Sequence, residues 1–215
     1  MRIAIDLQGV QSEGSRSRGI GRYSLEVIKN IINEHPEDEI VLVANSSLFD
    51  MRLDLKNYIE NDNVTYLQWY SPAPYDYVSM DKIKTKLATY LRSYVFNCLQ
   101  VDIILITSFF EGFSDNCCVD FDYDILDVPI VAIFYDLIPL INPNLYLTNN
   151  PDFEKYYRSK IRKIRNLDGL LAISNSALKE AKKYLRFNHN KIFNISSACD
   201  KKTFNKFTKI ETSNL

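Results

Sequence analysis

The chain has few of the residues that most often build metal centres and disulfide frameworks. Its 215 residues include two histidines, four cysteines, six glycines and one tryptophan. His35 and His189 stand in no metal-ligand spacing, and the cysteines form no CxxC pair. We therefore expect no metal ion and free thiols in a reducing compartment, the thiols being those of Cys98, Cys117, Cys118 and Cys199.

Long apolar runs and an excess of one charge are also missing. No run approaches the ~18 apolar residues of a membrane span. Asp6 interrupts the N-terminal apolar stretch, so we expect no signal peptide. The 26 basic and 27 acidic side chains leave a net charge of -1, which argues against nucleic acid as a partner. These features favour a cytoplasmic protein.

Apolar runs alternate with helical patterns along most of the chain. Runs that are apolar throughout are typical of strands buried on both faces of a parallel sheet. The pattern predicts an α/β domain over residues 1–200, Rossmann-like and doubly wound, with a mostly parallel sheet of about seven strands. Residues 201–215 read as a tail or the start of an interdomain linker. Strands are expected at 2–7, 39–44, 64–70, 102–106, 129–134, 169–173 and 191–195, and helices at 20–35, 48–59, 81–99, 152–167 and 176–185.

Two of the expected helices are rich in basic residues. We expect the helix over 81–99 to bury one apolar face, made by Ile83, Leu87, Leu91, Tyr94, Val95 and Cys98. Its basic residues are Lys82, Lys84, Lys86 and Arg92, and those of the helix over 152–167 are Lys155, Arg158, Lys160, Arg162, Lys163 and Arg165. Such faces either contact anionic lipid at a membrane surface or are simply solvated. Both interpretations stay open.

In an open parallel sheet, ligands bind outside the C-terminal ends of the strands. The loop after the first expected strand holds four of the six glycines and three arginines, which suit an anion site or a flexible loop. Its spacing matches neither the Rossmann nor the Walker motif. After the fifth strand, Tyr135 and Asp136 suit a hydroxylated ligand or a turn. Glu111 follows the fourth strand, and Ser174, after the sixth, suits a helix cap better than a ligand contact.

Several of these segments together resemble a known family. They are IAIDLQG (3–9), SRGIGRY (17–23), YDLIPL (135–140), LAISNS (171–176) and ACD (198–200) followed by Phe204. Their content and order resemble the N-terminal lobe of the family 4 glycosyltransferases of bacterial polysaccharide biosynthesis, which have a two-lobed GT-B fold. The resemblance covers nearly the whole chain.

The resemblance implies sugar transfer with retention, from a nucleotide-sugar donor to a glycan or lipid-linked acceptor, without a metal or other cofactor. It implies that Gly19, Gly21 and Arg22 face the donor phosphates. Tyr135 and Asp136 would be the catalytic residues at the reacting sugar. Because many relatives carry His where this chain has Tyr135, Asp136 is the stronger candidate. We expect acceptor contacts from Arg18, Glu111 and Ser174.

The chain has no room for the second lobe, which in this family holds the nucleotide and an E-x7-E pair. Glu26 and Glu34 have that spacing, but they fall on a helix of the first lobe, and we interpret the match as coincidence. We therefore expect this chain alone to transfer sugar weakly or not at all. The alternative is a non-catalytic binding or regulatory module derived from such an enzyme.

Overall fold

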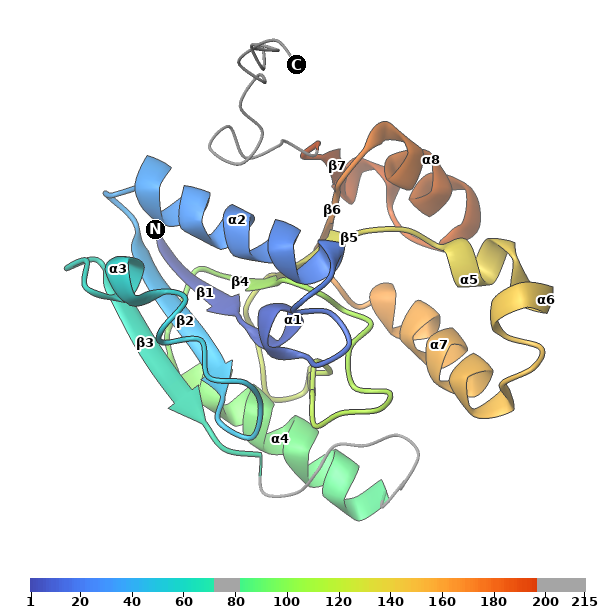
Figure 1. Ribbon diagram of the computed structural model, residues 1–215, viewed down its shortest axis with the longest axis horizontal. Helices are drawn as coiled ribbons and strands as arrows, with labels where there is room; N and C mark the ends of the chain where they lie inside the picture. The colour runs from blue at the N-terminus through green and yellow to red at the C-terminus, as the bar shows by residue number, and fades with distance from the viewer. Residues whose placement is uncertain (72–81, 197–215) are drawn as a thin grey trace, which may run out of the picture.

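The computed structural model describes residues 1–71 and 82–196. They form a seven-stranded sheet whose neighbouring strands are all parallel, in the order β3-β2-β1-β4-β5-β6-β7 (Figure 1). This confirms the predicted α/β Rossmann-like fold. The strands are β1 (Arg2–Asp6), β2 (Glu39–Asn45), β3 (Val64–Trp69), β4 (Ile103–Ile106), β5 (Ile130–Phe134), β6 (Gly169–Ala172) and β7 (Ile192–Asn194).

Helices link these strands and cover both faces of the sheet. Neighbouring strand residues point to opposite faces, so Ala4 joins one apolar cluster and Ile5 the other. The first cluster packs against α4, α7 and α8, and the second against α2. The helices are α1 (Gln8–Gln11), α2 (Gly19–Glu34), α3 (Lys56–Ile59), α4 (Lys82–Cys98), α5 (Ile138–Ile141), α6 (Pro143–Tyr146), α7 (Pro151–Ile164) and α8 (Asn175–Tyr184), with a 3-10 turn, η1 (His189–Lys191).

The buried face of α4 differs from the expected one. Arg92 is fully buried and pairs with Asp6, its Nη1 lying 3.1 Å from Oδ1. Its guanidinium lies between the rings of Phe96 and Phe121, at 4.6 and 4.2 Å from their centres. Of the apolar residues expected on the buried face, Leu91 and Val95 pack against the core, whereas Ile83, Leu87, Tyr94 and Cys98 are exposed.

Three short segments also differ from expectation. Most of the helix expected at 48–59 is replaced by turns, because the Asp50 carboxylate accepts from the backbone N–H of Arg52 and only Lys56–Ile59 is helical. The helices α5 and α6 are single turns, each with a proline at its N-terminus.

The motif at 198–200 with Phe204, and the tail at 201–215, lie outside the described residues. Within residues 1–71 and 82–196, none of the helices is long and apolar enough to span a bilayer.

Candidate functional site

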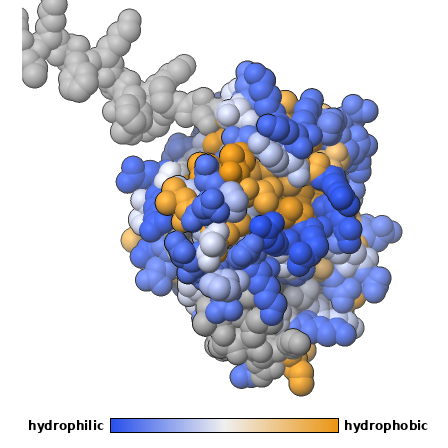
Figure 2. Space-filling model, turned by 90° about the vertical axis from the view of Figure 1, so that its right-hand side faces the viewer, coloured by the Kyte–Doolittle hydropathy of each residue, from blue (hydrophilic) through white to orange (hydrophobic). Residues whose placement is uncertain are grey.

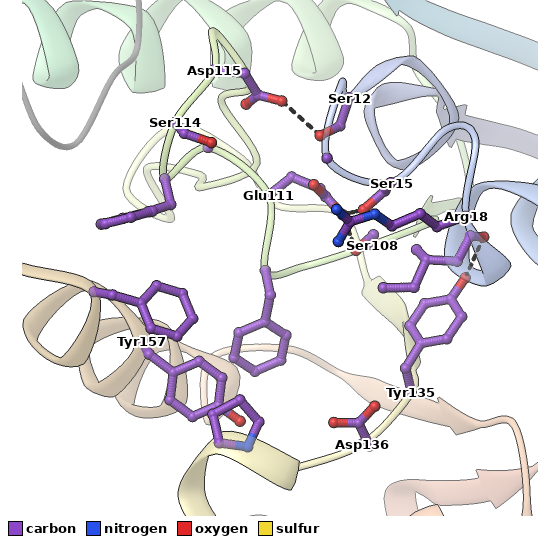
Figure 3. A pocket seen from close by; sticks show the side chains of 17 residues that line it. Ser12, Ser15, Arg18, Ser108, Glu111, Ser114, Asp115, Tyr135, Asp136 and Tyr157 are labelled. Atoms are coloured by element: carbon purple, nitrogen blue, oxygen red, sulfur yellow. Dashed lines mark hydrogen bonds between the residues drawn. The ribbon is translucent and has the colours of Figure 1, made fainter. Parts of the chain in front are cut away.

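A cavity of about 440 Å³ opens at the C-terminal ends of β1, β4 and β5 (Figure 3). The strand order reverses between β1 and β4, because the chain returns from β3 at one edge of the sheet to β4 beside β1. This is the position where doubly wound sheets bind ligands, because the loops on either side diverge and leave a crevice. Four segments line it: the loop between α1 and α2, the loop after β4, the loop after β5, and the start of α7.

One wall of the cavity is polar and is built around Glu111. Its Oε1 atom accepts hydrogen bonds from Ser15 Oγ at 2.5 Å and from Ser108 Oγ at 2.8 Å. Next to this group, Ser12 Oγ donates to Asp115 Oδ2 at 2.6 Å. The two carboxylates and their serines form a row of acceptors that suits the hydroxyl groups of a ligand.

Glu111 is 7% exposed, and burial raises the pKa of its carboxyl group. The serine hydrogen bonds act in the opposite direction, and the charge of Asp115 adds to the rise. The side chain of Arg18 extends toward this wall in Figure 3. Arg18 therefore supplies positive charge on the side of the cavity where the carboxylates gather.

The opposite wall is aromatic. Phe110 stacks on Tyr157 with ring centres 5.0 Å apart, and Phe153 lies 5.8 Å from Tyr157. Phe113 meets Phe153 edge-on at 5.1 Å. An apolar wall facing a few convergent polar groups is typical of small-molecule sites. A sugar ring presents this combination of an apolar face and a rim of hydroxyls.

Hydrogen bonds from Tyr156 and Gln8 hold the loop that carries Glu111 in place. The Tyr156 hydroxyl lies 2.8 Å from the carbonyl of Phe110 and 2.6 Å from that of Glu111. Further along this loop, the buried side chain of Gln8 donates to the carbonyl of Cys118 at 2.7 Å and accepts from its N–H at 2.7 Å. The acidic stretch that follows β4 is therefore anchored to the start of α1, and Cys118 is fully buried.

Asp136 and Tyr135 lie next to each other at the end of β5, and both line the cavity. Asp136 Oδ1 accepts from the N–H of Ile138 at 3.0 Å and so begins α5. Asp136 therefore forms the turn that its sequence position suggested. Its carboxylate also faces the cavity in Figure 3. The hydroxyl of Tyr135 lies 2.7 Å from Ser24 Oγ and 3.2 Å from the carbonyl of Thr107, and burial raises its pKa.

The glycine loop divides into two parts. Arg18 lines the cavity, whereas Gly19, Gly21 and Arg22 do not. The N–H of Gly21 donates to the carbonyl of Ser15 at 3.0 Å. Gly19 and Arg22 are exposed in the first turn of α2, where the helix dipole favours an anion. Their contact with donor phosphates stays a prediction.

Ser174 lies at the N-terminus of α8, and its Oγ accepts from the N–H of Ala177 at 3.1 Å. This is the capping arrangement, and Ser174 is not among the residues that line the cavity. Its contact with an acceptor stays a prediction. The reasoning from sequence also missed the serines at 12 and 15 and the four aromatic residues, because no spacing in the sequence indicates which loop residues face a cavity.

One group of possible metal ligands occurs within the described ranges. His35, Glu37 and Asp38 lie close together just before β2. They are therefore at the N-terminal ends of the strands, whereas the cavity lies at the C-terminal ends. Asp38 already pairs with the N-terminal amine of Met1. Exposed acidic groups of this kind are common without a metal, and this one offers the cavity no ligand.

Solved structures establish what kind of domain carries this cavity. The apo form of the lipopolysaccharide outer core galactosyltransferase WaaB matches 94% of this chain over 47% of its own, with a TM-score of 0.52 and 14% identity. UGT89C1 of Arabidopsis thaliana, complexed with UDP, matches 93% of this chain over 49% of its own, with a TM-score of 0.52 and 10% identity. The chain therefore has the Rossmann-like fold of one lobe of a GT-B glycosyltransferase.

Curated sequences give a closer relationship. The serotype-specific mannosyltransferase WbdA of Escherichia coli is 30% identical over 203 residues, which are 92% of this chain and 24% of WbdA. A second WbdA is 27% identical over 173 residues. The chain is thus homologous to part of WbdA and spans about a quarter of its length. No family model matches the chain.

Proposed function

We propose that this chain is the N-terminal, acceptor-side lobe of a retaining glycosyltransferase related to family 4. The complete enzyme transfers a sugar from a nucleotide-sugar donor to a glycan or lipid-linked acceptor. The homology to WbdA favours mannose as the transferred sugar. The observation that carries the proposal is the two-sided cavity at the switch point of the sheet, because its aromatic and carboxylate walls fit a sugar ring.

In this proposal the cavity holds the end of the acceptor glycan. The Phe110–Tyr157 pair packs against the apolar face of the sugar, while Glu111 accepts from its hydroxyls. Asp136 lies at the rim, where its carboxylate orients the attacking hydroxyl or stabilises positive charge at the reacting sugar. The first turn of α2 approaches the donor phosphates with Gly19 and Arg22.

Transfer requires stabilisation of the departing nucleotide diphosphate, which in this proposal comes from a second lobe. The chain by itself should then bind acceptor weakly and donor barely at all. Saturation-transfer NMR with α-1,2-mannobiose tests the first expectation, and isothermal titration with GDP-mannose tests the second. Signal transfer to the disaccharide, with no tight binding of GDP-mannose, supports the proposal.

Glu111→Gln is the matching variant, since it keeps the shape of the side chain and removes the charged acceptor. It should weaken mannobiose binding about tenfold, as expected for a lost hydrogen bond to a charged group. Glu60→Gln makes the same change at an exposed position next to α3 and should leave binding unchanged. Micromolar binding of GDP-mannose by this chain alone would contradict the proposal that the chain is one lobe of an enzyme. If Glu111→Gln binds mannobiose as tightly as the native chain does, the assigned pocket is wrong.

A further inference from the structure

A second cavity, of about 190 Å³, lies at the same edge of the sheet as the candidate site. Its lining comes from α1, from α2 with the loop before it, and from the segment that follows β2. Because β1 and β2 run parallel, the residues that follow them lie at the C-terminal ends of the strands, where the candidate site also opens. We call the candidate site the main cavity and this one the side cavity.

Residues 12–18, which connect α1 to α2, separate the two cavities. Ser15 and Arg18 line the main cavity, whereas Arg16 and Ser17 line the side cavity. The N–H of Arg18 donates to the carbonyl of Ser15 at 2.9 Å, so the loop is closed into a turn. Since consecutive residues of this one loop face different cavities, the loop is a wall that both cavities share.

The inner lining of the side cavity is apolar. Val10 and Met51 are 2% and 4% exposed, and Leu25 is half-buried. Val10 and Met51 belong to the apolar cluster on the α2 side of the sheet, and Leu25 packs against that cluster. The side cavity is therefore a hollow over the core, and its inner lining offers an apolar face to a ligand.

The rim of the side cavity carries one cation and one anion. The guanidinium of Arg16 lies over the ring of Phe49, 3.9 Å from its centre. Gln11 donates to the carbonyl of Phe49 at 2.8 Å, which ties the segment after β2 to α1. Asp54, on the same segment, supplies an exposed carboxylate. Within residues 1–71 and 82–196 neither Arg16 nor Asp54 forms an ion pair, so both charged groups can bind a ligand.

These groups suit a neutral sugar. The guanidinium donates to sugar oxygens, the carboxylate accepts from sugar hydroxyls, and the apolar lining covers the C–H face of the ring. An anion such as phosphate would be repelled by Asp54. A wholly apolar ligand would bury Arg16 and Asp54 without partners, which is costly. The volume is less than half of the 440 Å³ of the main cavity, so the side cavity suits one small unit of a ligand.

Where the main cavity meets α5, the surrounding surface is apolar instead. Pro139 of α5 lines the main cavity there. Figure 2 shows apolar residues gathered on the face of the molecule that carries α5 and α6. The large exposed side chains of these two helices are Ile138, Ile141, Leu145 and Tyr146. Of these only the tyrosine has a hydrogen-bonding group, so partners for further sugar hydroxyls lie on the side of residues 12–18.

We propose that the side cavity is a second sugar subsite, which holds a unit of the acceptor glycan further from the reacting end. Because the main cavity holds the end of the acceptor in the proposed function, on which this assignment rests, the glycan crosses residues 12–18 to reach the side cavity. There Arg16 donates to the sugar and Asp54 accepts from it. A longer acceptor is then preferred over a short one, since the second cavity adds contacts without a second loss of translational freedom.

Amide NMR titration of the full chain with α-1,2-linked mannobiose and mannotetraose tests the assignment. Mannotetraose should bind about tenfold more tightly, as expected for added hydrogen bonds to charged groups. The amide signals of Ser17 and Gly21, which line the side cavity, should shift with mannotetraose and not with mannobiose. The double variant R16Q with D54N removes one charge of each sign and leaves the net charge unchanged. It should bind both oligosaccharides with the affinity that the native chain has for mannobiose.

D50N with R52Q is the matched control. Asp50 and Arg52 form an exposed ion pair at 2.6 Å on the same segment after β2, and they line neither cavity. This variant should keep the tenfold preference for mannotetraose, and retained mannobiose binding shows that each variant folds. If neither oligosaccharide binds the native chain, the proposed function fails and the subsite with it. If mannobiose binds but mannotetraose binds no more tightly, or if R16Q with D54N keeps the preference, only the assignment of the side cavity is wrong.

Discussion

Ser15 and Glu111 are 96 positions apart in the sequence, yet the Ser15 hydroxyl donates to the Glu111 carboxylate at 2.5 Å. This bond joins the glycine loop to the loop that follows β4, and so closes the polar wall of the cavity. The same oxygen also accepts from Ser108. Glu111 is therefore held in one orientation by two serines while burial disfavours its charge.

The raised pKa of Glu111 predicts how stability depends on pH. A carboxyl group whose pKa is higher in the folded state binds its proton more tightly there, so it lowers the free energy of unfolding as pH rises from about 4.5, its ordinary value, through the raised pKa. In Glu111→Gln this contribution is absent. Urea unfolding of both proteins between pH 4 and pH 8 should show the native chain losing stability relative to the variant as pH increases. A constant difference across this range would show that Glu111 titrates normally.

Gly21 is expected to tolerate no side chain. A Cβ atom there would lie 2.4 Å from the Cα of Arg16 and 2.5 Å from the carbonyl oxygen of Ser15, and backbone atoms cannot move aside cheaply. Gly21→Ala should lower the free energy of unfolding by about 1–3 kcal/mol, the usual range for overpacking. Thermal and urea unfolding measure this loss.

Gly19→Ala is the matched control, since a Cβ atom at Gly19 meets nothing within 4 Å. Alanine is the better helix former, so this variant should keep or raise stability, by up to about 1 kcal/mol. Equal losses for both substitutions would mean that the close approach of α2 to residues 15 and 16 is not what requires glycine at 21.

The buried pair of Arg92 and Asp6 predicts a strong non-additive effect. Removing one partner leaves the other charge buried and uncompensated, so Arg92→Met should cost about 3–5 kcal/mol of stability. The double variant Arg92→Met with Asp6→Asn should recover part of that loss, because it has no buried, unpaired carboxylate at position 6. Urea unfolding of the two single variants and the double variant completes the cycle. Additive losses would show that the two groups do not stabilise each other.

The same pair shows what the sequence could and could not predict. Apolar strands and their alternation with helices were enough for the sheet, because burial on both faces leaves a local pattern. The periodicity of α4 predicted a buried apolar face, but only Leu91 and Val95 of that face pack against the core, and Arg92 is buried beside them. The burial of Arg92 depends on its ion pair with Asp6, which lies 86 positions away in the sequence. A local sequence pattern does not indicate so distant a partner.

The candidate site divides in a similar way. The rule for parallel sheets led to Arg18, Glu111, Tyr135 and Asp136, all of which line the cavity. The aromatic wall was not foreseen, because Phe and Tyr in loops and on α7 look like ordinary core residues. Tyr157 lies opposite Glu111 because α7 packs against the loop after β4. This is a tertiary contact between segments far apart in the sequence, so no local pattern predicts it.

Tyr135 and Asp136 are neighbours, but their contacts predict different roles. The Tyr135 hydroxyl lies within hydrogen-bond distance of Ser24 Oγ and the carbonyl of Thr107, so we expect it to position α2 and not to contact a ligand. Tyr135→Phe should cost about 1 kcal/mol of stability, the net value of a typical hydrogen bond, and leave mannobiose binding by the chain unchanged. Asp136→Asn should weaken that binding severalfold while changing stability less, because the asparagine carbonyl still accepts from Ile138. Urea unfolding and saturation-transfer NMR on the two variants separate these roles, and loss of mannobiose binding in Tyr135→Phe would assign its hydroxyl to the sugar instead.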